Sequence, residues 1–514
     1  MLVVHSPWDN HSGGIVIDVE CHLSNGLPGI TIIGYANKAI DEAKERLRSA
    51  FASSKIQLPR KRIVINLAPA DVPKESTSFD VPIAVAILSA SGQITTEVNP
   101  RTGFIGEIGL DGTIRPVRGV IGKILAGKRS GITSFIIPAA NLDQCMMIPD
   151  VELLPFATLS QLYTYLTTGK TDQVITTGSG QLPTKIKSIT YSVSISDIIG
   201  QERAKRALEI AAAGNHNVLL NGPPGTGKST LAKALLSIMP PMTHEETVEV
   251  THLQSLAAAD YGQIVTARPF RSPHHSASHV AIVGGGHNLR PGEITLSHRG
   301  VLFFDELPEF NRLTIEALRY PLEEQVISIS RAKESVEYPA DFIFIATANP
   351  CPCGYYNTEK PCRCMPHEIQ RYRRKLSGPI LDRIDLYVEV DGVDHEHLLR
   401  ENQNNQTTEI IRARVIKAQQ LQQSRYKINK RNARMTNQDI KTHAHLSQSA
   451  KELLNTAAKK LDISARSYMR TIKIARTIAD LETSPQIEPH HISEALQYRS
   501  HNYHGGNVKI MKNV

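Results

Sequence analysis

The sequence predicts an α/β protein whose central part is a phosphate-loop domain, preceded by a separate α/β domain and followed by a helical region. The first observation behind this prediction is a G-x-x-x-x-G-K-[ST] motif, which lies between an apolar run at 216–220 and a helical pattern at 230–238. The second is a pair of apolar runs, at 301–304 and 342–348, that each end in polar side chains, as parallel strands do at the ligand-binding edge of a sheet. The third is the length of 514 residues, which is too long for one domain.

The composition excludes several classes of protein. The first residues lack the basic and then apolar pattern of a secretory signal, and the longest apolar stretch, 81–90, is too short to cross a bilayer. Six cysteines in a chain of this length are no disulfide framework, so we expect a reducing, cytoplasmic location and no membrane partner. The formal charge of +8 favours a polyanionic partner.

The first third of the chain has the pattern of a compact α/β domain. Strands are predicted at 14–20, 30–33, 62–67, near 104–109 and at 135–137. The pattern at 37–53 predicts an amphipathic helix, whose apolar face carries Ile40, Ala43, Leu47 and Phe51, and the apolar run at 80–90 predicts a buried helix. We expect this domain to span 1–169. A segment rich in Thr, Gly, Ser and Lys, at 170–190, predicts a linker.

One part of this domain resembles a known family. The run GEIGLDGTIRPV at 106–117, with IIP at 136–138, resembles the S5 domain 2-like proteolytic domain of Lon-type proteases. That family uses a Ser–Lys dyad, and Ser78 stands at the position of the nucleophile. The matching lysine position falls on Ile121, and Lys123 stands where the family has a second, non-catalytic lysine. Because a serine hydroxyl needs an adjacent base, we expect a non-proteolytic relative.

The run NGPPGTGKST at 221–230 predicts an ATP-binding loop. Glycines let successive backbone N–H groups point at phosphate oxygens, and the helix that follows adds its positive N-terminal end. Lys228 can reach the β- and γ-phosphates, and the hydroxyl of Ser229 can bind Mg²⁺. The predicted nucleotide-binding residues are Gly222, Pro223, Pro224, Gly225, Thr226, Gly227, Lys228, Ser229 and Thr230.

Two carboxylates follow the apolar run at 301–304. Four apolar residues that end in two acids predict a buried strand that carries these acids to the edge of the sheet where ligands bind. Asp305 would bind Mg²⁺, directly or through water, and Glu306 would polarise the attacking water. Together with the phosphate loop, this pair predicts ATP hydrolysis.

A resemblance to AAA+ ATPases implies roles for further residues. Asn349 matches the sensor-1 position, at which a polar side chain helps to place the attacking water. LDRID at 381–385 resembles the arginine-finger segment of the chelatase and replicative-helicase branch, so Arg383 would enter the active site of a neighbouring subunit. The helix that begins with SAR at 464–466 resembles the sensor-2 helix. Arg466 would reach the phosphates in its own subunit, and Arg470 is its rival.

The same resemblance implies how the domains divide. A segment like 197–201 wraps the adenine base in AAA+ proteins, which makes Ile198 and Ile199 candidate base contacts. The ATPase core is expected over 191–395, with a helix-2 insert and a hairpin before sensor 1, then a helical lid at 396–500 and a loose tail at 501–514. Four histidines between 274 and 287 show no fixed ligand pattern, so that segment is interpreted as a mobile, glycine-rich insertion loop.

A C-x-C…C-x-C pattern follows Asn349. Cys351, Cys353, Cys362 and Cys364, with eight residues between the two pairs, could hold Zn²⁺ as tetrahedral thiolate ligands. The C-x-C spacing is tighter than the usual C-x₂-C, and His367 is a possible substitute ligand. We expect a structural zinc site here.

Basic segments are candidate nucleic-acid contacts. Arg331 and Lys333 fall near the tip of the hairpin predicted at 326–338, and Arg371, Arg373, Arg374 and Lys375 follow the cysteines. From 411 to 434 the chain has eight Lys or Arg residues and no Asp or Glu, a pattern that favours phosphate contact. Solvated charged surfaces are the competing interpretation of all three segments.

Taken in order, GLPGITIIG, INLAPADVPK, FRSPHHSASH, GVLFFDEL, ANPCPCGYY and SARSYMRTIKIARTIADL resemble the YifB/ComM-type magnesium-chelatase-like AAA+ proteins over nearly the whole chain. The resemblance implies an ATP-driven hexameric motor that binds single-stranded and branched DNA and promotes branch migration of recombination intermediates when transforming DNA is integrated. The alternative is a magnesium-chelatase-like motor subunit that remodels a protein or metal-insertion client. An ATP-dependent protease is disfavoured by Ile121.

Overall fold

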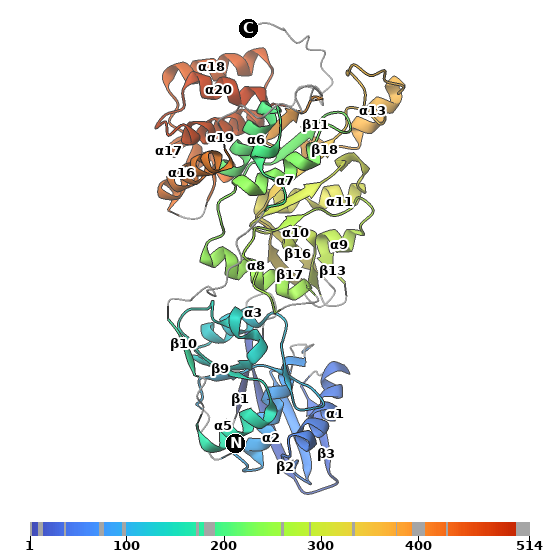
Figure 1. Ribbon diagram of the computed structural model, residues 1–514, viewed down its shortest axis with the longest axis vertical. Helices are drawn as coiled ribbons and strands as arrows, with labels where there is room; N and C mark the ends of the chain where they lie inside the picture. The colour runs from blue at the N-terminus through green and yellow to red at the C-terminus, as the bar shows by residue number, and fades with distance from the viewer. Residues whose placement is uncertain are drawn as a thin grey trace. The chain divides into compact units, whose positions relative to one another are not determined.

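A computed structural model describes residues 3–499 apart from 9–13, 35–37, 71–73, 75–76, 95–98, 171–173, 179–190, 259–261, 287–288, 331–334, 377, 393–406 and 428–429. The predicted tail at 501–514 and the predicted boundary between core and lid at 395 therefore lie outside the described residues. The chain forms two compact units, drawn in Figure 1. Unit 1 comprises Met1–Ser188, Thr243–Thr266 and Ser330–Glu337, and unit 2 comprises Ile189–Met242, Ala267–Ile329 and Tyr338–Val514.

Unit 1 is built on an eight-stranded mixed sheet with the order β10-β9-β8-β5-β1-β2-β4-β3. Its strands are β1 Val4–Trp8, β2 Ile15–Ser24, β3 Gly29–Ile33, β4 Arg62–Ala68, β5 Thr102–Phe104, β8 Ser134–Pro138, β9 Val151–Phe156 and β10 Ile175–Thr177. A separate small pair joins β6 Glu107–Ile108 to β7 Ile114–Arg115. The helices are α1 Lys38–Ser53, α2 Asp80–Ala90, α3 Val120–Arg129, α4 Leu142–Cys145 and α5 Leu159–Thr168.

The helices predicted at 37–53 and 80–90 are present as α1 and α2. Ala43, Leu47 and Phe51 of α1 are buried, as the helical pattern predicts. Every residue of α2 from Asp80 to Leu88 is buried, which explains why its sequence shows no polar face. Asp80, the one acid among them, is paired with Arg46 of α1 at 2.8 Å.

The predicted linker at 170–190 needs correction. Ile175–Thr177 is an edge strand, β10, which pairs antiparallel with β9. The hydroxyl of Thr177 also bonds the backbone of Val151. Short β-branched residues suit such an edge strand, whereas the composition of the surrounding residues resembles a linker. Residues 171–173 and 179–190 of the predicted linker lie outside the described residues.

An apolar cluster of unit 1 is packed against by two side chains that follow the phosphate loop in sequence. The cluster is formed by α3, α4, β8 and β9, and Val248 and Ile264 pack against it. Val248 belongs to α8, His244–Ala257, whose first turn is closed by a capping box of Thr243 and Glu246. Residues 243–266 therefore belong to unit 1, although the sequence analysis assigned them to the ATPase core.

Unit 2 contains a five-stranded parallel sheet with the order β12-β15-β18-β11-β19. The strands are β11 Val218–Asn221, β12 Phe270–Arg271, β15 Val301–Phe304, β18 Ile343–Ala348 and β19 Leu386–Glu389. The apolar runs that were predicted as strands are β11, β15 and β18, so their carboxyl ends meet at one edge. Helices α6 Glu202–Gly214 and α7 Lys228–Ile238 flank β11 in sequence.

The segment between β12 and β18 is folded rather than a mobile loop, which corrects the interpretation of residues 274–287. It contains α9 His279–Val283, β13 Gly284–Gly285, β14 Arg290–Pro291, α10 Glu293–Leu296, α11 Arg312–Ala317, α12 Arg319–Glu324 and the two-stranded sheet of β16 Val326–Ser330 and β17 Ser335–Pro339. Gly284 has a φ of 103°, and a Cβ there would lie 2.6 Å from Cδ1 of Ile329. Glycine is needed here for close packing, not for mobility.

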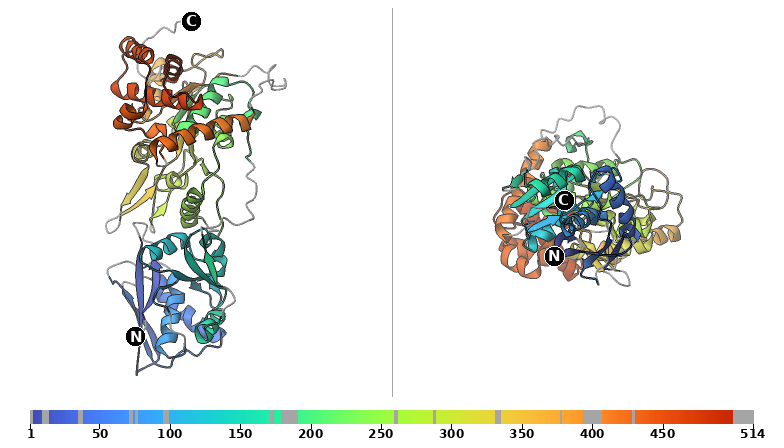
Figure 2. Two further views of the ribbon diagram at one scale, coloured as in Figure 1. Left: turned by 90° about the vertical axis from the view of Figure 1, so that its left-hand side faces the viewer. Right: turned by 90° about the horizontal axis from the view of Figure 1, so that it is seen from below.

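The last fifth of the chain supplies further helices, of which the first and the fourth pack on α6. They are α16 Thr408–Tyr426, α17 Asn437–His443, α18 Gln448–Lys460, α19 Ala465–Leu481 and α20 Pro489–Gln497, and two shorter helices, α13 Pro366–Arg374 and α14 Gly378–Leu381, precede them. The long orange helix α16 is seen from the side in Figure 2. Ile411, Val415 and Ala418 of α16 join the same apolar core as Leu208 of α6 and Ile478 of α19.

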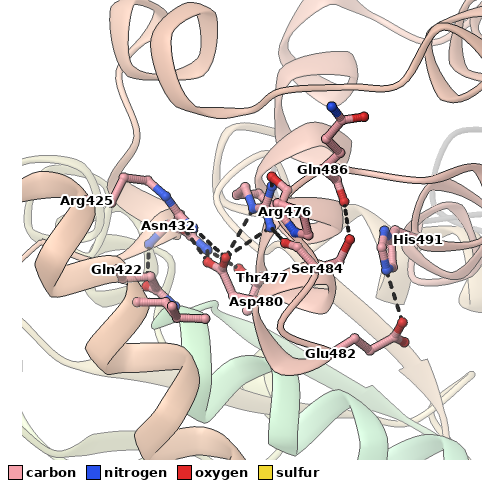
Figure 3. A network of polar contacts seen from close by, with 12 residues as sticks. Gln422, Arg425, Asn432, Arg476, Thr477, Asp480, Glu482, Ser484, Gln486 and His491 are labelled. Atoms are coloured by element: carbon pink, nitrogen blue, oxygen red, sulfur yellow. Dashed lines mark hydrogen bonds and ion pairs between the residues drawn. The ribbon is translucent and has the colours of Figure 1, made fainter.

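Asp480 of α19 is the centre of a buried polar network (Figure 3). Its carboxylate accepts hydrogen bonds from Arg425 at 2.5 Å, from Nδ2 of Asn432 at 2.8 Å and from Nε of Arg476 at 3.2 Å. The side chains of Arg476 and Asp480 are both 1% exposed. Buried charges are tolerated only when they are paired, so this network fixes α16, the turn at 432–434 and α19 against one another.

Candidate ATP site and its surroundings

The phosphate loop connects the end of β11 to the start of α7. Gly225 and Gly227 have φ values of 82° and 81°, the left-handed region that glycine adopts without cost. A Cβ on Gly222 would lie 2.1 Å from the carbonyl oxygen of Val390, so the loop passes too close to the chain after β19 for any other residue. These positions explain the glycines of the motif.

Lys228 is held over its own loop. Its Nζ donates hydrogen bonds to the carbonyl oxygens of Gly222 at 2.6 Å and Pro223 at 2.7 Å, and it lies 3.3 Å from Oδ1 of Asn349. Burial lowers the pKa of Lys228, and the charges of Asp305 and Glu306 oppose that effect. A phosphate oxygen in this loop would offer the ammonium group a charged partner in place of two neutral carbonyls.

The two predicted Mg²⁺ ligands are in contact. Oγ of Ser229 lies 3.1 Å from Oδ2 of Asp305. The other carboxylate oxygen, Oδ1, accepts a hydrogen bond from Oγ1 of Thr347 at 2.7 Å, and the same hydroxyl accepts one from the backbone N–H of Glu306 at 2.7 Å. Hydroxyl and carboxylate oxygens are suitable ligands for Mg²⁺, so Ser229 and Asp305 fit that ion.

Thr347 was missed by the sequence analysis. It is fully buried in β18, the strand beside β15, where it stands among apolar residues. A threonine as the penultimate residue of an otherwise apolar strand, beside the strand that carries the acids, was the available signal. Its role is to fix the orientation of Asp305 and the backbone of Glu306.

Glu306 and Asn349 form the next contact of the site. Nδ2 of Asn349 donates to Oε1 of Glu306 at 3.2 Å, while Oδ1 faces Lys228. Glu306 has a φ of 55°, an uncommon value for a residue other than glycine that is concentrated at functional sites. The structure thus brings together Lys228, Ser229, Asp305, Glu306 and Asn349, all five of the residues expected at this edge of the sheet.

Arg383 and Arg466 contact one shared carboxylate, that of Glu323 in α12. Nη2 of Arg383 donates to Oε2 of Glu323 at 2.6 Å, and Arg466 donates to Oε1. Arg383 also donates from Nε to the carbonyl of Arg319 at 3.0 Å and from Nη1 to that of Pro379 at 2.6 Å. Glu323 was missed by the sequence analysis, because no local pattern links it to either arginine.

Arg470, the rival of Arg466, is engaged elsewhere. Its side chain is 15% exposed, donates to the carbonyl oxygen of Asp382 and lies 3.6 Å from Asp385. Asp385 is also 3.1 Å from Nδ1 of His216, and these partners lower its pKa against the opposing effect of burial. Arg470 therefore anchors the segment that carries Arg383, whereas the half-exposed Arg466 is the more accessible of the two.

The two candidate adenine contacts differ in exposure. Ile198 is buried in the core of unit 2, and Ile199 is half-exposed. Their role at the base stays a prediction.

The four cysteines predicted to bind zinc lie together. The Sγ atom of Cys351 is 3.3 Å from that of Cys353 and 3.7 Å from that of Cys362, and all four sulfur atoms lie within 4.8 Å of one another. A backbone hydrogen bond from Tyr355 lowers the pKa of Cys353 to about 6, whereas the neighbouring sulfur atoms raise the pKa of Cys362 and of Cys364. All four would have to be thiolates to bind a metal ion. The cluster fits a tetrahedral thiolate site for Zn²⁺, and His367 belongs to no candidate metal group among the described residues.

Comparison with known families accounts for most of the chain. The family profile "Subunit ChlI of Mg-chelatase" matches residues 19–141, "Magnesium chelatase, subunit ChlI" matches 194–398 and "Magnesium chelatase, subunit ChlI C-terminal" matches 405–499. The chain is 41% identical over 495 residues to competence protein ComM of Haemophilus influenzae, with 94% of each chain covered. It is 40% identical over 489 residues to the protein YifB of Escherichia coli, again with 94% of each chain covered.

The chain belongs to the ComM/YifB family of magnesium-chelatase-like proteins. Membership indicates an AAA+ core that uses ATP and Mg²⁺, in agreement with the contacts around Lys228 and Asp305. The resemblance of the N-terminal domain, here called the front domain, to Lon proteases is partial. A Lon protease of Salinispora arenicola is 32% identical over 152 residues, which cover 28% of this chain and 18% of that protein.

The front domain has no base at the position of the Lon lysine. Ile121 is fully buried in the apolar cluster of α3, and Ser78 is buried in the short turn before α2. Lys123 lies with its ammonium group 4.2 Å from the centre of the Trp8 ring. The non-proteolytic character of the domain stays a prediction.

A second group of potential metal ligands, Glu482, His490 and His491, is better explained by hydrogen bonding. Nδ1 of His491 accepts from the backbone N–H of Glu488 at 2.8 Å. Its Nε2 must then carry the proton that is donated to Glu482 at 3.1 Å, and a protonated nitrogen cannot bind a metal. Arg206, 3.7 Å from Glu482, also disfavours a cation here.

Only some of the residues predicted to contact nucleic acid lie in the part of the chain that the structure describes. Arg331 and Lys333 lie outside the described residues. Arg371, Arg374 and Lys375 are exposed on or just after α13; Lys375 pairs with Glu309 at 3.0 Å, and Arg373 lies over the ring of Tyr356. Their contact with DNA stays a prediction.

The basic run at 411–434 is mostly engaged within the chain. Six of its cations bond other residues of the chain: Arg412 with Ser237, Arg414 with Glu209, Arg425 with Asp480, Lys430 with Asp439, Arg431 with Gln419 and Arg434 with Leu322. The interpretation of this run as a phosphate-binding surface is therefore wrong for these six residues. Three of these partners are acids, Glu209, Asp480 and Asp439, and all three lie outside the run, so the local sequence did not indicate the pairing.

No helix among the described residues is long and apolar enough to cross a membrane.

Proposed function

We propose that this chain is the subunit of a cytoplasmic, ATP-driven hexameric DNA motor, a helicase or translocase, that promotes branch migration of recombination intermediates during natural transformation. The observation that carries the proposal is a set of side-chain contacts at one edge of the sheet. Asn349 contacts both Lys228 and Glu306, and Ser229 contacts Asp305. Such an arrangement of a cation, a carboxylate base and a hydroxyl–carboxylate pair suits phosphoryl transfer to water.

Each residue would have a distinct part in hydrolysis. Ser229 and Asp305 would hold Mg²⁺. The bound ion would neutralise negative charge on the phosphates. Lys228 would exchange the carbonyls of its loop for phosphate oxygens. Glu306, oriented by the amide of Asn349, would accept the proton of the attacking water. Arg383 would stabilise the transferring phosphoryl group in the site of a neighbouring subunit, so that hydrolysis depends on assembly.

Three features support DNA as the client of the motor. The formal charge of the chain is +8, basic residues of α13 are exposed, and the 41% identical relative from Haemophilus influenzae is named a competence protein. The alternative client is a protein or a metal-inserting complex, which the name of the magnesium-chelatase family favours. A chelatase-like motor would have no need of DNA for its ATPase activity.

The test is ATP hydrolysis by the purified full-length chain, alone and with single-stranded, duplex and four-way-junction DNA, with junction movement measured in parallel. We expect ATP-dependent junction movement that Lys228→Ala abolishes. Lys233→Ala is the matched control, because Lys233 is an exposed lysine on the same helix, α7. ATPase activity that is indifferent to every DNA would contradict the proposal and favour the chelatase-like alternative, and normal turnover by Lys228→Ala would refute the phosphate-loop assignment.

A further inference from the structure

The turn that carries the first two cysteines packs directly against the phosphate loop. Gly354 closes this turn by donating its N–H to the carbonyl of Cys351 at 3.0 Å. Gly354 is buried and has a φ of 86°, and a Cβ at this position would lie 2.5 Å from Cδ and 3.1 Å from Cγ of Pro224. Pro224 is the third residue of the phosphate loop's GPPGTGKS run. Only glycine allows the turn to approach the loop this closely.

The same turn is joined to the phosphate loop by a second route. Asn349 precedes Cys351 by two residues, and its side chain lies 3.3 Å from Nζ of Lys228. Lys228 in turn donates to the carbonyl of Pro223, the neighbour of Pro224. The cysteine turn thus contacts the loop on one side through Gly354, and the chain just before the turn contacts Lys228 of the loop through Asn349.

The sulfur atoms show what would hold the turn in place. Cys351 and Cys353 belong to the turn, while Cys362 and Cys364 come from the chain before α13. Sγ of Cys362 lies 3.7 Å from that of Cys351 and 3.6 Å from that of Cys353, separations that suit thiolates on one tetrahedral ion. A bound ion would therefore tie the turn to the later segment, and the four residues fit Zn²⁺ for that purpose.

We propose that the cysteine cluster, closed by a thiolate-bound ion such as Zn²⁺, is a brace for the phosphate loop, and that the contact of Gly354 with Pro224 makes nucleotide affinity depend on metal occupancy. The inference rests on the proposed function, because it takes the loop around Lys228 as the nucleotide site. It assigns to the cluster a positioning role at that site, beyond stabilising its own turn.

The first test substitutes Gly354 by alanine in the full-length chain and measures the dissociation constant of a fluorescent ADP analogue, with zinc content from elemental analysis. Gly131→Ala is the matched control: Gly131 also has a φ of 86°, but a Cβ there would have no neighbour within 4 Å. Both substitutions place a Cβ on a residue with a φ of 86° and so cause the same backbone strain, but only the Cβ of Gly354→Ala would contact the phosphate loop, at Pro224. We expect ADP binding about tenfold weaker for Gly354→Ala, a loss in the range that displaced positioning residues cause, and unchanged for Gly131→Ala.

Two further measurements separate the brace from simple misfolding. The double variant Gly354→Ala/Pro224→Ala removes the ring that the new methyl group would meet, and we expect it to recover most of the lost affinity. Zinc removal by a chelator should weaken ADP binding by the wild-type chain, and added zinc should restore it. Wild-type affinity in Gly354→Ala and in the zinc-depleted chain would overturn the brace, whereas full ADP binding by Lys228→Ala would overturn the nucleotide site itself.

Discussion

Individual residues at the ATP site were predictable where a chemical motif required them. The loop from Gly222 to Thr230 and the acids at 305 and 306 follow from what phosphate and Mg²⁺ bind, and the structure brings the key side chains into contact. The partners of these residues were not predictable. Thr347 and Glu323 act through tertiary contacts with residues 41 or more positions away, for which a single sequence carries no local pattern.

Thr347→Val tests how far the orientation of Asp305 matters. The substitution keeps the shape of the side chain but removes the hydroxyl that bonds Asp305 and the N–H of Glu306. We expect a 10–100-fold lower kcat for ATP, about the effect of losing a partner of a metal ligand, and a higher Mg²⁺ requirement. The measurement is ATP turnover as a function of Mg²⁺ concentration. Thr347→Ser should restore activity, and a valine variant with the wild-type Mg²⁺ profile would contradict this role.

Glu323→Gln tests whether the shared carboxylate positions Arg383 and Arg466. The amide removes the charge that faces both guanidinium groups while Arg383 keeps its two backbone acceptors. We expect ATP turnover by the assembled protein to fall about tenfold with little change in ADP binding, because the arginines would act on the transition state. Glu324→Gln, at the adjacent exposed position, is the control. Equal turnover by both variants would count against a positioning role for Glu323.

At the scale of elements, hydrophobic pattern predicted the long helices and the buried strands, whereas packing decided the rest. The helices at 37–53 and 80–90 and the strands at 301–304 and 342–348 were predicted because each buries a periodic or continuous apolar set. The edge strand β10 and the folded segment from α9 to α10 were missed, because glycine and threonine suit loops and close packing equally well. The composition of a short segment does not distinguish these outcomes.

The contact between α19 and α20 predicts a pH dependence of stability. Burial lowers the pKa of His491, whose side chain is inaccessible and donates a hydrogen bond to Glu482 (Figure 3). In the unfolded chain a histidine has a pKa of about 6.5. As the pH falls below this value, the unfolded state binds a proton, whereas the folded state binds one only at a lower pH. Stability from this residue is therefore present above about pH 6.5 and decreases as the pH falls below it.

The measurement is the urea unfolding midpoint at pH 7.5 and pH 5.5 for the wild-type chain and His491→Gln. The loss between these pH values should be smaller in His491→Gln, by roughly 1.4 kcal/mol per unit of pKa shift at most. His490→Gln is the control, since the side chain of His490 is 63% exposed. If the variant at 491 loses as much stability as the wild type, the titration lies elsewhere.

For the whole molecule, the order of segments in the sequence does not match their grouping in space. The sequence analysis divided the chain at single boundaries near 170 and 395. In the structure, 243–266 and 330–337 return to unit 1 after unit 2 has begun. Boundaries read from composition assume that each domain is one continuous segment, and α8, with its ordinary helical pattern, gave no sign that its partners lie in α3 and α4.

Limited proteolysis should reveal this grouping. A tryptic cut at Lys185 or Lys187 separates residues 1–185 from the rest of the chain covalently, but Val248 and Ile264 remain part of the apolar cluster of unit 1. We expect the two fragments to elute together in size-exclusion chromatography under native conditions and to separate on a denaturing gel. Fragments that elute separately at native pH would show that the packing of 243–266 on unit 1 is too weak to hold them.

The assignment of α8 to unit 1 means that the chain crosses from unit 2 to unit 1 directly after the phosphate-loop helix. Helix α7 starts at Lys228 and ends at Ile238, and α8 starts at His244, so five residues separate the nucleotide helix from a helix of unit 1. Fully extended, five residues span at most about 18 Å. A short covalent connection therefore joins α8, a helix of unit 1, to the helix that begins at Lys228.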